Sequence, residues 1–412
     1  MRVLYVSAWF PWPPDNGARL RTYYLLKALA VRHEVHLISM LQEDSDPERA
    51  GNLADICRVV STHGSRWFRS GTVKSGLGYF SRVPRSFVDT YSPTIRQAVE
   101  EAVAQIRPDV IVASTLGAAP YIPTRAGIPT FLDEHNCEYA VLKRAADGRR
   151  SLVGRFLAEL GWRKFARWEA EMCGRFSGVS VVSRQDMELL MNVASGLVEV
   201  SVAPNGVDSR LIGLTQRRPK PGYLIYQGAL TYGANLDAVR WFASDVHPLI
   251  ARDYPDARLR VTGRAEGVEL GDLRDSAAVE LVGYVDDIRE ALAEASVCVV
   301  PLRQGGGSRL KVLEAMAAGV PVASTSVGVE GLDVVPGKHV MVGDTAAELS
   351  EAVRSILADP QVARELSDNA RELVLSEYDW SSIGRIFVAA VEKCAGCSAA
   401  ADCRSGPGTL RE

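Results

Sequence analysis

The sequence lacks any uninterrupted apolar run of 18 residues or more, so a membrane-spanning helix is not expected. Its net charge of -3 leaves no broad basic excess, and nucleic acid is therefore not an expected partner. Residues 1–38 open on a short apolar segment and turn polar at residues 13–17, which is not the pattern of a signal peptide.

Cysteine is sparse, and the seven residues present do not form a convincing disulfide framework in a chain of 412 residues. Four are scattered: Cys57, Cys137, Cys173 and Cys298. We expect these to be reduced, partly buried thiols in a cytoplasmic protein. The other three, Cys394, Cys397 and Cys403, cluster near the end of the chain. A structural zinc site needs four ligands and no histidine follows them, so a frayed tail is expected there instead.

Short Val/Ile/Leu runs alternate with helical stretches, which predicts parallel sheets covered by helices on both faces. In the first half, strands are expected at residues 3–6, 35–38, 110–113, 130–132 and 179–182. In the second half, they are expected at residues 224–227, 259–262, 279–282, 297–300 and 320–323. Residues 204–222 are rich in Pro, Gly and charge and predict a linker. The sequence therefore predicts two doubly wound α/β domains, one on each side of the linker. Ligands are expected beyond the carboxyl ends of their strands.

The first candidate site is the turn after the opening strand, Pro13-Pro14-Asp15-Asn16-Gly17-Ala18-Arg19. Gly17 can adopt a positive φ and lets a ligand approach the backbone. The following helix would direct its free N–H groups at this spot, which favours a phosphate. An ordinary strand-to-helix turn would look the same. The turn is not Gly-x-Gly-x-x-Gly, which argues against a dinucleotide-dependent oxidoreductase.

The second candidate site is the polar run Asp133-Glu134-His135-Asn136-Cys137-Glu138, directly after an expected buried strand. This architecture places catalysis at the carboxyl ends of strands. A lone histidine is more often structural than catalytic. The dense polar neighbours of His135 favour the functional interpretation.

The third candidate site is the segment from Pro301 to Gly319, which predicts a strand, a triple-glycine loop and a helix. Gly305, Gly306 and Gly307 let backbone amides close on a ligand, at an entropic cost that a plain turn would not need. Lys311 and Glu314 share one face of the expected helix. A cation beside a phosphate and a carboxylate accepting from ribose hydroxyls would suit that spacing. A surface ion pair is the alternative.

Several motifs, taken in order, resemble the family 4 retaining glycosyltransferases. They are the Pro-Pro-Asp-Asn-Gly loop, Ser183-Arg184-Gln185-Asp186, Pro204-Asn205-Gly206-Val207-Asp208, Val261-Thr262-Gly263-Arg264, Gly283-Tyr284-Val285-Asp286-Asp287, the run Glu314 to Val322, and Val327-Gly328-Val329-Glu330-Gly331. The resemblance extends from Arg2 to about Val391. It implies the GT-B fold, with two facing Rossmann-like domains. The first would span residues 1–205, and the donor domain residues 206–379. A helix at about 380–395 would cross back to the first domain, and residues 396–412 would form a disordered tail.

The resemblance also implies an activity: transfer of a sugar from a nucleoside diphosphate sugar to an acceptor, with retention of configuration and without metal. The co-substrate is the nucleotide sugar and no cofactor is expected. The acceptor would be a glycan, a lipid-linked sugar or a small molecule. The loops expected at the cleft carry no His, Asp and Glu cluster with metal-ligand spacing. Two alternatives remain open, namely a sugar-nucleotide epimerase of the same architecture and a catalytically silent nucleotide-sugar binding protein.

The resemblance assigns roles to individual residues. Glu314 would hold the ribose hydroxyls, backbone near Val285 the base edge, and His135 would lie near the anomeric centre as a positioning group. His135 and Glu314 are therefore the expected catalytic residues. The full set expected to bind substrate is Asn16, Gly17, Arg264, Val285, Gly305, Gly306, Gly307, Arg309, Leu310, Lys311 and Glu314.

Two departures from the family pattern bear on these roles. Many members carry a second glutamate eight positions before the one matching Glu314, where this chain has Gly306. Many also carry Arg and Lys after the first strand of the second domain, whereas residues 227–235 contain neither. Neutralising the diphosphate would then depend on Arg264, Arg309 or Lys311. The identity of the sugar stays open.

Two stretches mix cations with aromatic residues. Residues 63–88 hold five cations and no acids, and residues 155–168 combine arginine and lysine with tryptophan and phenylalanine. They fit either contact with anionic lipid carriers at a membrane surface or solvated faces over packed helices. The expected location is the cytoplasm, with peripheral binding to the inner face of the membrane if the first interpretation holds.

Overall fold

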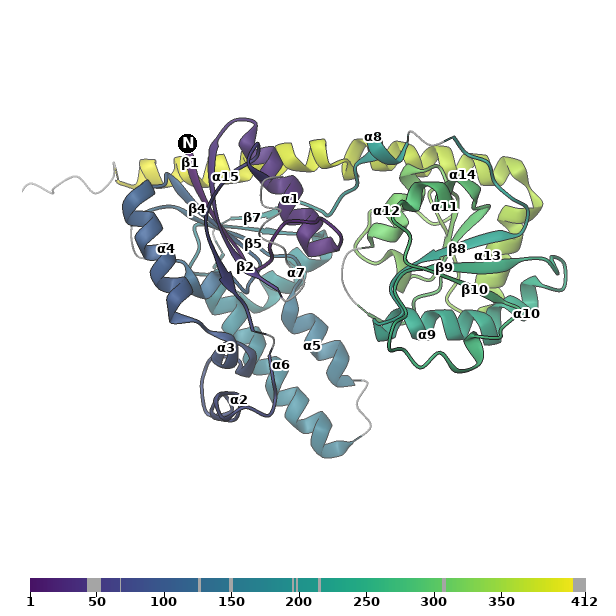
Figure 1. The fold of residues 1–412 in the computed structure, drawn as a ribbon, viewed down its shortest axis with the longest axis horizontal. Coiled ribbons are helices and arrows are strands. Elements are labelled where there is room, and N and C mark those ends of the chain that lie inside the picture. The colour runs from purple at the N-terminus through teal and green to yellow at the C-terminus, as the bar shows by residue number, and fades with distance from the viewer. Residues whose placement is uncertain are drawn as a thin grey trace, which may run out of the picture. The chain divides into compact units, whose positions relative to one another are not determined.

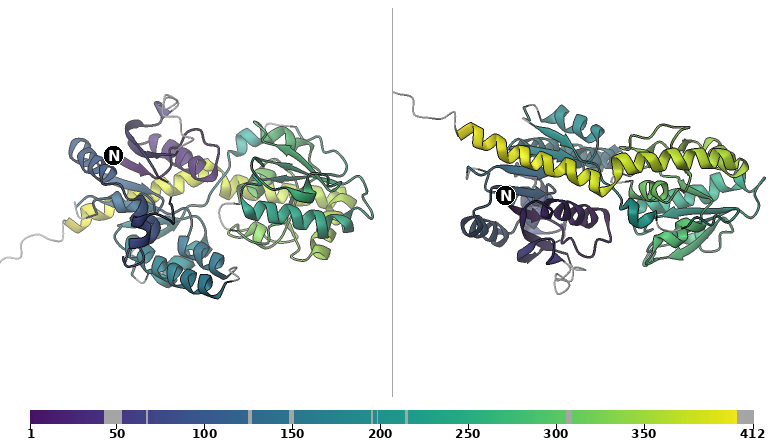
Figure 2. Two further views of the ribbon diagram at one scale, coloured as in Figure 1. Left: turned by 60° about the horizontal axis from the view of Figure 1, so that its bottom comes forward. Right: turned by 90° about the horizontal axis from the view of Figure 1, so that it is seen from above.

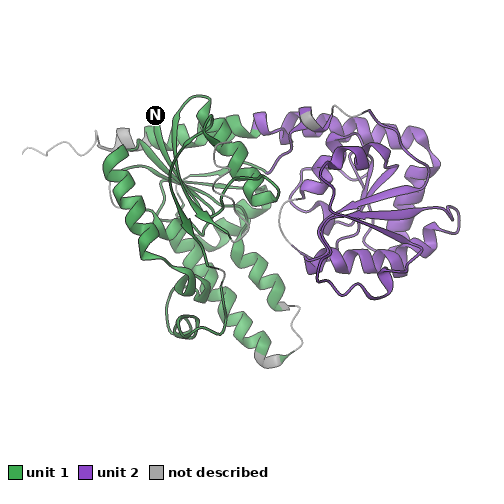
Figure 3. Ribbon diagram, in the orientation of Figure 1, with its two compact units in different colours: residues 1–204, 383–412 green, residues 205–382 purple. Residues whose placement is uncertain are grey.

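The computed structural model describes residues 1–42, 53–66, 68–124, 127–147, 151–194, 196–197, 199–213, 216–305 and 309–402. It divides into two compact units (Figure 3). Unit 1 comprises residues 1–204 together with the chain from Ile383 onward, and unit 2 comprises residues 205–382. In each unit a sheet is enclosed by helices, as the views in Figures 1 and 2 show.

Unit 1 is built on a parallel sheet with the strand order β3-β2-β1-β4-β5-β6-β7. Its strands are β1 (Arg2–Ser7), β2 (Glu34–Leu41), β3 (Arg58–Gly64), β4 (Val110–Ser114), β5 (Thr130–Asp133), β6 (Gly178–Val181) and β7 (Val200–Val202). Its helices are α1 (Gly17–Ala30), α2 (Val73–Leu77), α3 (Arg85–Thr90), α4 (Pro93–Ile106), α5 (Glu138–Asp147), α6 (Leu152–Cys173) and α7 (Arg184–Val193). The central strands β4, β5 and β6 are buried along their whole length, as continuous apolar runs require.

Unit 2 repeats this plan with the parallel order β10-β9-β8-β11-β12-β13. Its strands are β8 (Tyr223–Gln227), β9 (Arg258–Thr262), β10 (Val279–Gly283), β11 (Val297–Val300), β12 (Val322–Ser324) and β13 (Met341–Val342). Its helices are α8 (Ser209–Ile212), α9 (Gly233–Trp241), α10 (His247–Ile250), α11 (Ile288–Glu294), α12 (Leu310–Ala317), α13 (Ala346–Ala358) and α14 (Pro360–Leu373). One apolar core of buried strand and helix residues holds the unit together.

The final helix, α15 (Trp380–Asp402), begins in unit 2 and packs along the sheet of unit 1 (Figure 2). The Phe387 ring lies edge-on to that of Phe131 in β5, with centroids 5.7 Å apart. The Cys394 thiol is buried and donates to the carbonyl of Thr130 at 3.6 Å. Cys394 therefore belongs to this packed helix and not to a frayed tail. Residues 403–412, which include Cys403, lie outside the described residues.

The predicted strands are all present, but the sheets contain three more: β3, β7 and β13. Each of these three strands lies at an edge of its sheet. An edge strand is only half-covered, so β3 carries polar residues such as Ser61 and His63 instead of a continuous apolar run. The apolar pattern therefore missed them. Cys57, Cys137, Cys173 and Cys298 are free and buried, as predicted.

Candidate active site

The strand order of each sheet reverses at one point, and the loops that leave the strands there diverge to form a crevice. In unit 2 the reversal falls between β8 and β11, so the loops after Gln227 and Val300 flank it. In unit 1 it falls between β1 and β4. Thr115, directly after β4, has a φ of +70°, which a β-branched residue adopts only under constraint. Both crevices are where doubly wound sheets bind ligands.

At the crevice of unit 2, Lys311 of α12 reaches across to the end of β8 and the start of α9. Its ammonium donates to the Tyr226 hydroxyl at 2.8 Å and to Asn235 Oδ1 at 3.0 Å. A Cβ added at Gly228 would lie 2.8 Å from Lys311 Nζ and 2.7 Å from Asn235 Nδ2, so a side chain there would displace the ammonium or the Asn235 amide. The loop over residues 227–235 has no cation of its own, and Lys311 supplies one from another element. Tyr226 and Asn235 were not predicted as site residues.

Glu314 lies one turn further along α12 and is half-buried. Its carboxylate makes no hydrogen bond or ion pair with any residue that the structure describes. Burial raises the pKa of Glu314 to about 7, partly offset by Lys311. Burial also lowers the pKa of Lys311 to about 7. An unpaired carboxylate in this position is costly unless a ligand supplies donors.

The loop before α12 also carries predicted residues. Gly305 has a φ of +107°, a left-handed conformation that favours glycine. Its carbonyl accepts from Arg309 Nη2 at 3.3 Å, and the same nitrogen lies 3.3 Å from a carboxylate oxygen of Glu330. Arg309 is buried at the N-cap position of α12, and Leu310 is the first residue of the helix. Gly306 and Gly307, and Ser308 beside them, lie outside the described residues.

Arg264 and Val285 occupy loops at the carboxyl ends of β9 and β10. Arg264 is exposed, and its guanidinium lies 5.4 Å from the ring centroid of Tyr284. Val285 is half-buried in the loop that leads to α11.

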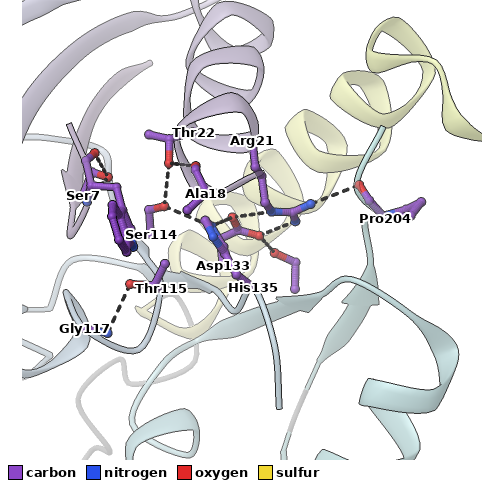
Figure 4. A network of polar contacts seen from close by, with 12 residues as sticks. Ser7, Ala18, Arg21, Thr22, Ser114, Thr115, Gly117, Asp133, His135 and Pro204 are labelled. Atoms are coloured by element: carbon purple, nitrogen blue, oxygen red, sulfur yellow. Dashed lines mark hydrogen bonds and ion pairs between the residues drawn. The ribbon is translucent and has the colours of Figure 1, made fainter. Parts of the chain in front are cut away.

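At the crevice of unit 1, the carboxylate of Asp133 is the centre of a polar network (Figure 4). Arg21 of α1 binds it with two nitrogens, at 3.0 Å and 2.6 Å. Ser180 donates to it at 2.7 Å, and His135 Nε2 lies 3.1 Å away. Burial by itself would raise the pKa of Asp133, but Arg21 and His135 outweigh burial and hold it below its usual range. Arg21 and Ser180 were not predicted, because α1 and β6 are distant in sequence.

His135 is held in one orientation by this network. Its Nε2 contacts Asp133 and also lies 3.3 Å from Ser114 Oγ (Figure 4). Burial lowers the pKa of His135, so the ring is neutral near pH 7 despite the opposing effect of Asp133. Because the carboxylate can only accept, Nε2 carries the proton and Nδ1 is left as an acceptor.

A pocket of about 1250 Å³ opens beyond the strands of unit 1, and His135 and Thr115 belong to its wall. Much of the wall comes from α2, α3, α5 and α6, and other parts from α1, β2, α4 and the loops after β1, β3 and β4. Asn16 and Gly17 are not part of it. Asn16 caps α1 by accepting from the Arg19 N–H at 3.1 Å. Gly17 begins that helix and is not among the glycines with positive φ, so its predicted conformational role is not used.

Within the described ranges, no three His, Cys, Asp or Glu side chains are grouped so that they could hold a metal ion. The one Asp-x-Asp triplet of the sequence, residues 44–46, lies outside those ranges. The described part of the chain also has no helix with the length and apolar character needed to cross a membrane.

Comparison with known families agrees with this architecture. A model described as Glycosyltransferase Family 4 matches residues 15–211, and one described as Glycosyl transferases group 1 matches residues 221–359. The chain belongs to the family 4 glycosyltransferases. The two matches fall on unit 1 and unit 2 of this glycosyltransferase-family chain.

Individual relatives of the family 4 chain match only in part. It is 31% identical to a glycogen synthase of Mycobacterium tuberculosis over 202 residues, 46% of this chain and 47% of that protein. It is 28% identical to a phosphatidyl-myo-inositol mannosyltransferase of Mycobacterium leprae over 228 residues, 52% of this chain and 58% of that protein. The match to the first of these spans about half of that relative's length.

Solved structures show the fold. A sucrose-phosphate synthase from Thermosynechococcus elongatus has a TM-score of 0.66 at 18% identity, covering 96% of this chain and 100% of that one. HepE of Anabaena, in complex with UDP and glucose, has a TM-score of 0.62 at 15% identity, covering 95% and 100%. The predicted GT-B fold, with two Rossmann-like domains, is confirmed.

Proposed function

We propose that this chain transfers a sugar from a nucleoside diphosphate sugar to an acceptor, with retention of configuration and without a metal ion. The observation that carries the proposal is the arrangement at the crevice of unit 2. There the Lys311 ammonium and the unpartnered Glu314 carboxylate lie on one face of α12. Family membership and the complex of HepE with UDP and glucose support the same donor chemistry.

Lys311 would bind the diphosphate. Its ammonium is held by two neutral oxygen atoms, those of Tyr226 and Asn235, and not by a carboxylate. A phosphate oxygen therefore offers it a stronger, charge-assisted partner. Arg264, at the carboxyl end of β9, is the second cation that we assign to the diphosphate. Fixed donors of this kind would stabilise the departing diphosphate in place of a metal.

Glu314 would accept hydrogen bonds from the two ribose hydroxyls. Its carboxylate is half-buried and lacks a protein donor in the described part of unit 2. Two hydroxyl donors would replace the water that burial removes, and they would lower its raised pKa again. Backbone near Val285 would meet the edge of the base.

His135 would hydrogen-bond the transferred sugar near the reacting carbon. Its free Nδ1 is an acceptor, while Asp133 and Arg21 fix the ring from the other side. A neutral, oriented imidazole positions a hydroxyl without changing the charge of the site. The leaving phosphate would act as the base, so His135 is a positioning group and not a general base.

The test is incubation of the whole chain with labelled UDP- and GDP-sugars. Transfer to an added acceptor, or slow hydrolysis that releases the free nucleoside diphosphate, supports the proposal. Conversion to an epimeric sugar would assign the chain to the epimerases. A donor that binds but stays intact would make it a binding protein. Either of the last two results overturns transferase activity.

Retention and metal independence are tested on the same reaction. The anomeric configuration of the newly formed bond, read by NMR, should match that of the donor. Excess EDTA should leave the rate unchanged. Activity that EDTA abolishes and magnesium or manganese restores would refute metal independence.

A further inference from the structure

The two basic and aromatic stretches of the sequence meet around the pocket of unit 1. Lys164 of α6 donates to the carbonyl of Gly78, just after α2, at 2.6 Å. The Phe87 ring of α3 lies 4.1 Å from that of Trp168 in α6, measured between centroids. In Figure 1, α2, α3, α5 and α6 extend together from one end of the unit-1 sheet. The same pocket wall includes His135.

Two cations on this wall are held only by neutral groups. Arg85 donates to the carbonyls of Ser70 and Ser75 and to the hydroxyls of Ser75 and Tyr79. Lys164 donates to a carbonyl, and burial together with Arg85 lowers its pKa. Neither cation forms an ion pair with a carboxylate within the described ranges. Arg66 and Lys74 add two exposed cations to the wall.

The carboxylates on the wall offset only part of this charge. Hydrogen bonds from Thr72 and Arg69, with smaller contributions from Lys74 and Arg66, lower the pKa of Asp89, so this carboxylate is ionised and partly balances those two cations. Asp89 accepts from the Arg69 N–H at 3.1 Å and from the Thr72 hydroxyl. Burial and the neighbouring Glu169 raise the pKa of Glu138 to about 7, so it is only partly ionised at neutral pH. The pocket therefore presents a net positive surface, which favours an anionic ligand.

Exposed apolar side chains lie on or next to two of the helices that contribute to the pocket wall. Those on and just after α2 are Val73, Leu77 and Phe80, and those on α6 are Phe156, Leu157 and Leu160. Phe80 is 93% exposed and Val73 is 82% exposed, so neither belongs to the core of the unit. Large apolar groups beside cations are typical of surfaces that bind anionic lipid. We call these six residues the α2–α6 patch.

We propose that this pocket takes a lipid-linked acceptor that carries a phosphate or diphosphate, with its apolar chain on the α2–α6 patch; this rests on the proposed function. The phosphate would lie beside Arg85 and Lys164, and the accepting hydroxyl would face His135. The volume, about 1250 Å³, exceeds the roughly 300–1000 Å³ of most small-ligand pockets and suits more than one sugar ring.

The charge requirement is tested by sedimentation of the full chain with vesicles. The probes are phosphatidylcholine vesicles with and without phosphatidic acid, a lipid phosphate monoester. The double variant Arg66→Gln/Lys74→Gln should lower partitioning into the phosphatidic acid vesicles about 30-fold, because each cation contributes to binding an anionic surface. The matched control, Arg252→Gln/Lys338→Gln, removes two exposed cations of unit 2 and should bind as wild type does.

The apolar requirement is tested in the same assay. Phe80→Ser/Phe156→Ser should lower partitioning about tenfold or more, since both rings are then absent from the lipid. Val31→Ser is the control, because Val31 is 79% exposed at the end of α1, away from the patch. Inorganic phosphate at the concentration of the lipid phosphate should not displace the protein.

Two results would show that the surface does not recognise anionic lipid: equal binding to both kinds of vesicle, or equal losses of binding in the patch and control variants. Full displacement by inorganic phosphate would also overturn the inference, because it would indicate a soluble phosphate ligand. Hydrolysis of the donor sugar without vesicles provides the separate readout for the proposed function. If hydrolysis persists while lipid binding is absent, only the lipid-linked acceptor is wrong. If lipid binding persists while hydrolysis and transfer are absent, the proposed function is wrong.

Discussion

Replacing Lys311 with methionine tests the donor site most directly. The change removes the ammonium that contacts Tyr226 and Asn235 and keeps a side chain of similar length. A hydrogen bond to a charged group contributes about 1.5–3 kcal/mol, so the dissociation constant for UDP should rise about 10- to 150-fold. The affinity is to be measured by calorimetry about one pH unit below the Lys311 pKa of about 7, where most of the free wild-type protein carries the ammonium.

The pH dependence of UDP affinity provides an independent test of the role of Lys311. In the free protein, burial lowers the pKa of Lys311 to about 7, and Arg309 adds to this while Glu314 opposes it. A bound diphosphate would raise that pKa, because a nearby anion favours the ammonium. Near pH 7 a proton released by Glu314 would oppose this effect, but above about pH 8 Glu314 is already ionised in the free protein. In that range binding must take up a proton at Lys311. UDP affinity should therefore fall with rising pH, by up to about tenfold per pH unit.

Three proteins should separate the contributions. Wild type should show the pH slope, and Lys311→Met should bind weakly without it. Lys311→Arg should keep the charge and also lose the slope, since a guanidinium does not titrate in this range. Proton uptake can be counted by repeating the titrations in buffers of different ionisation enthalpy. If the methionine variant binds UDP as wild type does, or keeps the slope, Lys311 does not contact the diphosphate.

Glu314→Ala should weaken UDP and GDP binding about 10- to 150-fold, because a carboxylate bonded to ribose hydroxyls contributes about 1.5–3 kcal/mol. Unchanged calorimetric affinity would remove Glu314 from the site. His135→Ala should reduce kcat by about two orders of magnitude if positioning dominates, and a wild-type rate would exclude that role. Arg21→Met should lower the free energy of unfolding by about 3–5 kcal/mol, because the fully buried Asp133 loses its partner. Urea unfolding measures this, and an unchanged midpoint would show that Asp133 is compensated by other groups.

Much of the fold could be predicted from local patterns. The continuous apolar runs at residues 110–113 and 297–300 predicted buried central strands, and both are buried along their length. The edge strand β3 was not predicted, because a half-covered strand does not need such a run. A strand that is buried on both faces requires a continuous apolar run, which can be recognised in the sequence. An edge strand does not require one.

The candidate donor site was predictable only in part. The spacing of Lys311 and Glu314 placed both on one helical face, since residues three apart share a face. Tyr226 and Asn235 carried no such signal. The role of Tyr226 depends on which helix packs over the end of β8, and the role of Asn235 depends on the course of the loop before α9. Those are contacts between separate elements.

The sequence by itself determined the alternation of strands and helices, the glycine-rich loop before Lys311 and the polar run around His135, because each is a pattern within a few residues. Only the tertiary structure decided that Arg21 neutralises Asp133, and that Lys164 meets the loop after α2 to form one pocket. These partners are far apart along the chain, and only packing around the sheet brings them within hydrogen-bond distance. The ion pair between Arg21 and Asp133 and the shape of the pocket could therefore be determined only from the folded structure.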